Sequence, residues 1–245
     1  MFTQNPDIEF LEENRTCSYF DEKISDIRYK YIHSCSSIQY QGMLERGWRR
    51  FGKIHFVPEC KSCTKCVSIR IDVANYKFSR SEKRVIAKNK ETKLYIRPPS
   101  LTMEHLSLYD KYHKFMNDKK DWPYSPIEPN DYLKSYVEAK EEFAKEFLYV
   151  RDEKLIGVAL VDILDKSISA IYCYYDHDYA DLSIGKFSIL AQIKIAKELK
   201  IPYIYLGYWI KDHFSMGYKE SYQPFEVLDN RACFDERPIW RKNEL

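Results

Sequence analysis

Three cysteines at strict three-residue spacing carry the clearest chemical signal in the chain. Cys60, Cys63 and Cys66 are separated by polar residues only, which suits an exposed turn and not an apolar segment in which cysteine packs as a small hydrophobe. A Cys-x-x-Cys-x-x-Cys turn brings three soft sulfur ligands within reach of one ion. The spacing therefore predicts a metal site, with a redox role and simple packing as the alternatives.

A fourth ligand has to come from another part of the chain. Cys17 is the first candidate, because it lies in a short polar segment followed by aromatic residues, and Cys35 is the rival. Cys173 lies in an alternating apolar run that predicts a core position, and Cys233 near the C-terminus is uninformative. Cysteine-only ligation suits zinc or an iron–sulfur cluster, and the spacing does not choose between them.

Positive charge is concentrated around these cysteines. The net charge of the whole chain is only +2, but residues 42–97 contain fifteen Lys and Arg against five Asp and Glu. Aromatic residues are interleaved with the basic ones, among them Trp48, Phe51, Phe56 and Tyr76. This pattern is typical of a surface that binds phosphates and stacks on bases, although a merely solvated face has the same composition.

Length and composition limit the class of protein. With 245 residues, of which 44% are hydrophobic, the chain can bury a full core. No apolar run approaches the roughly 18 residues that span a bilayer, and no secretory signal opens the chain, so we expect a cytoplasmic protein without a membrane partner. Seven cysteines, an odd number, favour reduced thiols over a disulfide framework.

The elements of the first half follow from short-range signals. The run 67–73 is strand-like, and a short basic helix opens at Arg80 with Ser79 or Ser81 as its cap. Apolar residues at steps of three and four predict an amphipathic helix over 102–117, and 131–144 is interpreted as a second helix.

The second half is rich in strands. We expect strands over 147–150, 156–164 and 168–175, the last two joined by a hairpin turn at Asp165-Lys166, then a helix over 184–199 capped by Ser183 and a strand over 202–208. The class is α+β, with an architecture analogous to that of N-acetyltransferase-like domains. Because two prolines follow Arg97, we place the boundary between a basic, cysteine-containing domain (1–98) and an acyltransferase-like domain (99–245) there.

Motifs along most of the chain match one family. Those motifs are Cys17-Ser-Tyr-Phe, Gly47-Trp-Arg-Arg-Phe-Gly, Pro58-Glu-Cys-Lys-Ser-Cys-Thr-Lys-Cys, Phe78-Ser-Arg-Ser-Glu-Lys-Arg, Val158-Ala-Leu-Val-Asp, Ser169-Ala-Ile-Tyr, Tyr203-Ile-Tyr-Leu-Gly-Tyr-Trp-Ile and Met216-Gly-Tyr-Lys. The chain resembles the aminoacyl-tRNA–protein transferases, in particular their bacterial leucyl branch, the aspartate/glutamate leucyltransferases. It departs from the family at Val67, where a proline is usual, and at Lys83-Arg84, where an Arg-Arg pair is usual.

The resemblance implies an aminoacyltransferase. Such an enzyme moves leucine from charged tRNA, its co-substrate, to the α-amine of proteins that begin with Asp or Glu, and the product is a destabilising N-terminus that marks the protein for degradation. No nucleophile elbow, metalloprotease helix or Ser/His/Asp arrangement stands out in the sequence. Positioning of two substrates and stabilisation of the oxyanion are therefore expected to dominate catalysis.

The resemblance also suggests roles for particular residues, which form four groups. The candidates are Arg49, Arg80 and Arg84 for the acceptor's carboxylate, with Lys219 as an outsider; Arg50, Lys83 and Lys88 for tRNA; Tyr208, Tyr218 and Lys219 for catalysis; and Cys17, Cys60, Cys63 and Cys66 for a metal. Contact with tRNA phosphates alone is the alternative for the three acceptor arginines, and a position in the core or on the surface without a catalytic role is the alternative for the tyrosines.

Three other functions stay open at this point. One is arginine transfer by a member of the same family, because no residue identifies the aminoacyl pocket. Another is a metal-containing RNA-binding module without catalysis. The last is a small-molecule N-acetyltransferase, although Ser183-Ile-Gly-Lys offers a single glycine where acetyl-coenzyme A enzymes have a glycine-rich loop.

Overall fold

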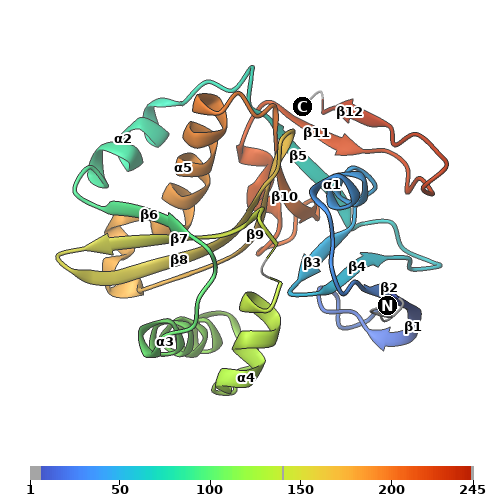
Figure 1. Cartoon of the computed structure of the whole chain (residues 1–245), viewed down its shortest axis with the longest axis horizontal. Coiled ribbons are helices and arrows are strands. Elements are labelled where there is room, and N and C mark those ends of the chain that lie inside the picture. Colours follow the sequence, from blue (N-terminus) through green and yellow to red (C-terminus); the bar gives the residue numbers. More distant parts are fainter. Residues whose placement is uncertain (1–6, 140, 244–245) are drawn as a thin grey trace, which may run out of the picture.

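The computed structural model describes residues 7–139 and 141–243, which form two β-sheets with helices packed against them (Figure 1). The smaller sheet is antiparallel, with the strand order β1-β2-β4-β3. Its strands are β1 (Ile8–Thr16), β2 (Ile24–Tyr31), β3 (Arg49–Phe51) and β4 (Ile54–Pro58). Helix α1 (Ser37–Glu45) shares a buried core with Val57 of this sheet. Because side chains alternate along a strand, the residues on either side of Val57 lie on the opposite face.

The larger sheet has eight strands in the order β12-β11-β5-β10-β9-β8-β7-β6. In chain order they are β5 (Val67–Asp72), β6 (Lys93–Arg97), β7 (Ala144–Arg151), β8 (Lys154–Ile163), β9 (Ser167–Tyr175), β10 (Tyr203–Trp209), β11 (Phe225–Leu228) and β12 (Trp240–Lys242). Among the described strands, only β9 and β10 are parallel neighbours, and α5 (Ile184–Glu198) provides the crossover that a parallel pair requires. Strand β5, from the first third of the chain, lies between β10 and β11.

Helices cover both faces of the eight-stranded sheet (Figure 1). Besides α1 and α5, the helical elements are α2 (Arg80–Lys88), α3 (Met103–Lys120), α4 (Pro129–Tyr132), the π-helical turn η1 (Leu133–Val137) and the 3-10 turns η2 (His177–Leu182) and η3 (Gly217–Ser221). Alternation along β7 separates two cores: Phe147 and Tyr149 belong to the cluster with α5, whereas Leu148 belongs to the cluster with α3 and η1.

Most of the predicted elements are confirmed. Helix α2 begins with a capping box, in which the Ser79 hydroxyl accepts a hydrogen bond from the Glu82 amide and the Glu82 carboxylate accepts one from the Ser79 amide. Helix α3 starts after its cap Thr102, and β8 and β9 form the expected hairpin. Ser183 is the residue before α5, as predicted, but its side chain makes no capping bond.

The predicted helix over 131–144 is wrong beyond its first two turns. The chain leaves helical structure after η1, and β7 begins at Ala144, which pairs with Asp162 of β8. Phe143 stacks on Tyr40 with ring centroids 5.3 Å apart, so it belongs to the core of the four-stranded sheet. Tertiary packing of this segment therefore overrides its local helix propensity.

The two sheets divide the chain between β4 and β5. The four-stranded sheet ends at Pro58, whereas β5, α2 and β6 already belong to the eight-stranded sheet and its helices. The predicted boundary at 98/99 therefore does not coincide with the change of sheet. Within the described residues, no helix is long and apolar enough to cross a membrane.

Gly52 forms a tight contact between the two halves of the chain. It has a φ of 53°, and a Cβ placed on it would lie 2.1 Å from the backbone oxygen of Lys134 in η1. We therefore expect Gly52→Ala to lower the free energy of unfolding by about 2 kcal/mol or more, measured by urea denaturation. Gly42→Ala is the matched control, because a Cβ on it would lie 3.8 Å from the Nη1 atom of the Arg46 side chain, an ordinary contact. Equal stability of the two variants would contradict this account.

Candidate catalytic centre and cysteine pocket

The three cysteines of the motif and Cys17 line one cavity. Cys17 directly follows β1, and Cys60, Cys63 and Cys66 lie in the loop between β4 and β5. The empty space of this pocket is about 500 Å³, part of it open to solvent, and Tyr19, Phe20 and Arg231 also line it. The structure thus brings together the four predicted thiols. The rival Cys35 is buried in the core of the four-stranded sheet.

The pocket contains side chains of the type that bind metals, but these side chains do not surround a common point as metal ligands do. Burial, followed by the neighbouring Cys17 and Cys60 groups, raises the pKa of the Cys66 thiol to about 12. Cysteine binds a metal as the thiolate, so a bound cation would have to stabilise this deprotonated form. In the part of the chain that the structure describes, no three His, Cys, Asp or Glu side chains form a group that could hold a metal ion. The residue types fit a thiophilic metal, whereas their placement does not close around one.

A second site lies where β9 and β10 separate. The two strands pair only from Tyr203 to Tyr205 of β10, and a bulge before Gly207 follows. Gly207 has a φ of 81°, which favours glycine. Arg49 of β3 reaches this point: its Nη2 donates a hydrogen bond to the Ala170 carbonyl at 2.7 Å, and its Nε would lie 3.5 Å from a Cβ on Gly207. The absence of a side chain at 207 leaves room for the guanidinium.

Two buried basic side chains lie at this bulge. Arg49 is 7% exposed, and its Nη1 has no hydrogen-bond partner among the described residues. Lys219 of η3 is 5% exposed, and its Nζ donates a hydrogen bond to the backbone oxygen of Tyr208 at 2.5 Å. Burial, followed by the positive charge of Arg49, lowers the pKa of Lys219 to about 7. An anionic group bound here would relieve the repulsion between the two side chains.

The two candidate tyrosines are placed differently. Tyr208 is buried, and its hydroxyl donates a hydrogen bond to the Gly47 carbonyl at 2.9 Å. Burial raises the pKa of Tyr208 well above its usual value, so the hydroxyl stays protonated. Tyr218 is 53% exposed, and no hydrogen bond among the described residues joins its hydroxyl to Arg49 or Lys219. Tyr208 and Lys219 therefore belong to the centre, and Tyr218 lies beside it in η3.

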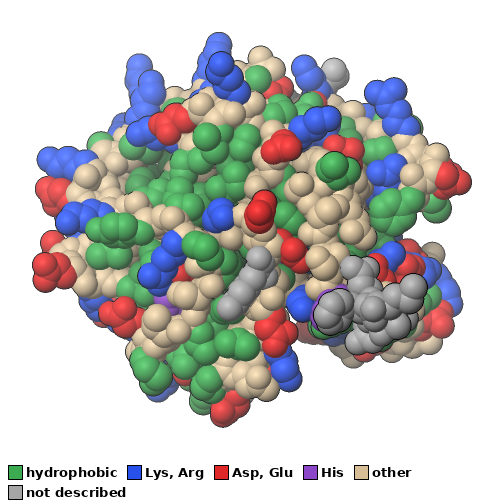
Figure 2. Space-filling model, viewed as in Figure 1, with side chains coloured by type: hydrophobic (Ala, Val, Ile, Leu, Met, Phe, Trp, Pro, Cys, Tyr) green, Lys and Arg blue, Asp and Glu red, His purple; other side chains and the backbone are tan. Residues whose placement is uncertain are grey.

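The candidates on α2 are not brought to this centre. Arg80, Lys83, Arg84 and Lys88 are all exposed on that helix, which packs against α5. Figure 2 shows Lys and Arg side chains along the upper rim of the molecule, where Figure 1 draws α2 and the loop before it. Their exposure suits contact with a large polyanion rather than recognition of one carboxylate.

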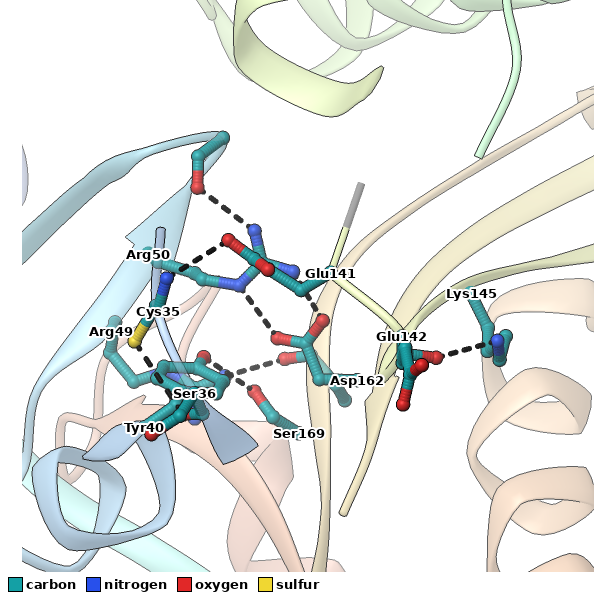
Figure 3. Close-up of polar contacts among 12 residues, drawn as sticks. Cys35, Ser36, Tyr40, Arg49, Arg50, Glu141, Glu142, Lys145, Asp162 and Ser169 are labelled. Atoms are coloured by element: carbon teal, nitrogen blue, oxygen red, sulfur yellow. Dashed lines mark hydrogen bonds and ion pairs between the residues drawn. The ribbon is translucent and has the colours of Figure 1, made fainter. Parts of the chain in front are cut away.

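Arg50 lies on the opposite face of β3 from Arg49. Its guanidinium forms a buried ion pair with Asp162 of β8 and also donates a hydrogen bond to the Gly52 carbonyl at 2.8 Å (Figure 3). Arg50 is 5% exposed and Asp162 is fully buried. The Arg50 side chain is thus bound inside the protein, so we do not propose it as a tRNA ligand. Sequence reasoning placed Asp162 in a strand but missed this partner.

Two family models match the chain. The one described as "Arginine-tRNA-protein transferase, N terminus" matches residues 15–84, and the one described as "Arginine-tRNA-protein transferase, C terminus" matches residues 104–229. Together they cover most of the sequence. The chain belongs to the arginine-tRNA-protein transferase family.

Relatives of this transferase carry a more specific name. An "Aspartate/glutamate leucyltransferase" of Helicobacter hepaticus is 48% identical over 233 residues, which is 95% of this chain and 97% of the relative. One of the same name from Campylobacter jejuni is 45% identical over 96% of this chain and 99% of its own length. Among solved structures, FemX is similar with a TM-score of 0.49 and 10% identity, covering 75% of this chain and 64% of FemX.

The candidate centre of the transferase is assembled from both matched segments. The N-terminal match contains the four cysteines and Arg49, and the C-terminal match contains Tyr208 and Lys219. Gly207, which makes room for Arg49, lies in the Tyr-Leu-Gly-Tyr-Trp motif of the sequence. A glycine inside an otherwise apolar strand is the signal that could have predicted this close approach.

Proposed function

We propose that this chain transfers leucine from leucyl-tRNA to the N-terminal Asp or Glu of acceptor proteins. Family membership supports an aminoacyltransferase that uses charged tRNA, and the names of relatives that are 45–48% identical support leucine and the acidic acceptors. The observation that carries the proposal is the buried pair of basic side chains, Arg49 and Lys219, at the bulge of β10. An acidic N-terminus supplies the negative charge that such a centre attracts.

The reaction needs no strong general base. The acceptor's α-amine has an ordinary pKa of about 7.7 to 8.0, so roughly a tenth of it is neutral at pH 7. Its nitrogen bonds to the leucyl carbonyl carbon, the ester bond to the ribose breaks, and the amine's proton is lost while the ribose oxygen gains one. Holding the two substrates together therefore accounts for most of the expected rate increase.

We assign the acceptor's carboxylate to Arg49. A planar guanidinium can bind a carboxylate through two parallel hydrogen bonds, and Nη1 of Arg49 is buried with no other partner in the described chain. Lys219 adds positive charge and supports the backbone at Tyr208. Arg80 and Arg84, exposed on α2 with Lys83 and Lys88, are assigned to tRNA phosphates instead.

One transfer assay tests this function. The purified chain is incubated with a peptide that begins with Glu and with tRNA charged with labelled leucine or labelled arginine. We expect the leucine label on the peptide and its loss after ribonuclease treatment. Arginine label alone would make the protein an arginyltransferase, and tRNA binding without transfer would make it an RNA-binding module. Acetyl-coenzyme A turnover without RNA would identify an N-acetyltransferase.

We further propose that Cys17, Cys60, Cys63 and Cys66 hold a thiophilic metal, as zinc or an iron–sulfur cluster. The presence of four thiols among the side chains that line one cavity supports this. When bound, the metal would neutralise the thiolates and tie the segment after β1 to the loop between β4 and β5.

Metal analysis of purified protein tests the cysteine pocket. After anaerobic purification we expect about one zinc per chain, or the iron and visible absorbance of a cluster. Cys63→Ser should remove the metal and lower the unfolding temperature, whereas Cys233→Ser, at an exposed position outside the pocket, should keep both. The proposal would be contradicted if the purified wild-type protein contained no metal and if Cys63→Ser had the same unfolding temperature as the wild type.

The proposal also covers the fold of the second half, the domain boundary, the cellular compartment and the fate of the acceptor. An acyltransferase-like second half is supported by the mixed sheet with its α5 crossover. We keep 98/99 as a proposed boundary between domains. We place the enzyme in the cytoplasm, where charged tRNA is found, and propose that the added leucine marks the acceptor for degradation.

A further inference from the structure

Aromatic side chains form a row across the face of the four-stranded sheet that points away from α1. The strand register places Phe10, Tyr29 and Phe56 beside one another on β1, β2 and β4. Ring centroids are 5.3 Å apart for Phe10 and Tyr29, and 6.5 Å apart for Tyr29 and Phe56. Phe51 of β3 continues the series, stacked at 5.9 Å from Phe56. These four residues are called the aromatic row.

The aromatic row connects the two halves of the molecule. Phe51 contacts the rings of Tyr136 in η1 at 6.0 Å and Tyr172 in β9 at 6.2 Å. Phe56 contacts Tyr208 at 6.3 Å, and the backbone oxygen of Tyr208 accepts the hydrogen bond from Lys219. The row therefore runs from the outer edge of the small sheet to the candidate centre.

This face of the sheet is exposed. Phe10 is 52% exposed and Phe51 is 36% exposed. The register places Ile8, Tyr31 and Ile54 on the same face, and each of them is exposed as well. A contiguous apolar surface of this kind marks a binding site, because an isolated protein gains nothing from leaving it in water.

Positive charge borders the row. Arg15 donates a hydrogen bond to the Tyr29 hydroxyl at 2.7 Å, and Glu12 on the same face is paired with Arg15. At the far end, Lys53 lies in the turn between β3 and β4, and the backbone of Lys134 in η1 contacts that turn at Gly52. Glu12 is thus neutralised by Arg15, and Lys53 and Lys134 lie at the Phe51 end of the row.

We propose that the aromatic row stacks the unpaired nucleotides at the 3′ end of the charged tRNA and leads the aminoacyl ester to Arg49 and Lys219. The inference rests on the proposed function and names the surface that function would use. Exposed rings on a sheet, with cations at the rim, are how proteins bind single-stranded RNA. A polypeptide acceptor would instead gain from aliphatic contacts and from strand pairing at the open edge of β1.

A truncation experiment on the RNA tests the inference. The dissociation constant is measured by fluorescence anisotropy at fixed salt, for uncharged leucine tRNA and for the same tRNA without its last three nucleotides. Wild-type protein should bind the truncated tRNA more weakly. Phe10→Leu and Phe51→Leu keep apolar area but remove the rings, so each should weaken binding of the complete tRNA about 5- to 100-fold. The double variant should no longer distinguish the two RNAs.

Tyr95→Leu is the matched control, because Tyr95 is 50% exposed on β6 at the other edge of the eight-stranded sheet. It should bind both RNAs like the wild type. Phe10 lies in an exposed edge strand, so Phe10→Leu should keep the wild-type unfolding temperature. Its binding data therefore remain a valid test even if Phe51→Leu destabilises the protein. Unchanged tRNA affinity, or an equal loss for both RNAs, would overturn the inference. A raised KM for the peptide alone would assign the face to the acceptor. Failure of leucine transfer by the wild type would count against the proposed function only.

Discussion

Arg49→Met is expected to lower kcat/KM for a peptide that begins with Glu by about 10²- to 10³-fold, with little change in KM for leucyl-tRNA. Met keeps the stem of the side chain and its packing beside Gly207, but it removes the guanidinium whose Nη1 is buried without a partner in the described chain. The loss should therefore concern the acceptor and not the RNA. Arg49→Lys should fall between, because it keeps the charge and loses the planar pair of donors.

The control for this result is on α2. Arg80→Met and Arg84→Met remove exposed guanidinium groups of the same chemistry, and we expect them to raise KM for leucyl-tRNA, most strongly at low salt, without affecting the peptide. The decisive measurement compares peptides that begin with Glu and with Gln. If Arg49→Met still prefers Glu to Gln as strongly as the wild type does, the carboxylate is bound elsewhere.

Asp162→Leu is expected to lower the free energy of unfolding by about 3 to 5 kcal/mol, measured by urea denaturation. The reason is that Arg50, 5% exposed, would keep its charge inside the protein with no carboxylate beside it. The double variant Arg50→Met/Asp162→Leu should recover much of this loss, because an apolar pair of similar volume replaces the ion pair without a buried charge.

An exposed ion pair provides the comparison. Arg241 and Asp229 are 67% and 40% exposed, so Asp229→Ala should change the free energy of unfolding by less than about 1 kcal/mol. A small effect of Asp162→Leu, close to that of Asp229→Ala, would show that Arg50 finds water or another partner. A double variant as unstable as the single one would show that the pair contributes more than charge compensation.

Local signals predicted the elements, and in part the site. The spacing of Cys60, Cys63 and Cys66 implied that they share one pocket, and Cys17 does line that pocket with them. Ser79 predicted the start of α2 correctly, because a cap depends on residues three positions apart. These predictions succeeded because each depends on residues that are close in the sequence and on the chemistry of their side chains.

Contacts between distant segments could not be predicted from the sequence alone. Arg49 and Arg50 are adjacent, and strand alternation implies only that they lie on opposite faces, not that one meets Gly207 and the other Asp162. The helix predicted after Asp131 failed because Phe143 packs on Tyr40, about a hundred residues away. Charge and composition gave Arg50 a role at the surface, although it lies in the interior.

The position of β5 constrains how the protein is made. This strand leaves the ribosome well before β10 and β11, the two neighbours between which it lies, because they belong to the last fifth of the chain. Until Tyr203 and the residues after it are synthesised, β5 has both edges unpaired, which is a state prone to misassociation. The final strands therefore act as a late closing step, and a nascent chain needs protection at β5 until that step is complete.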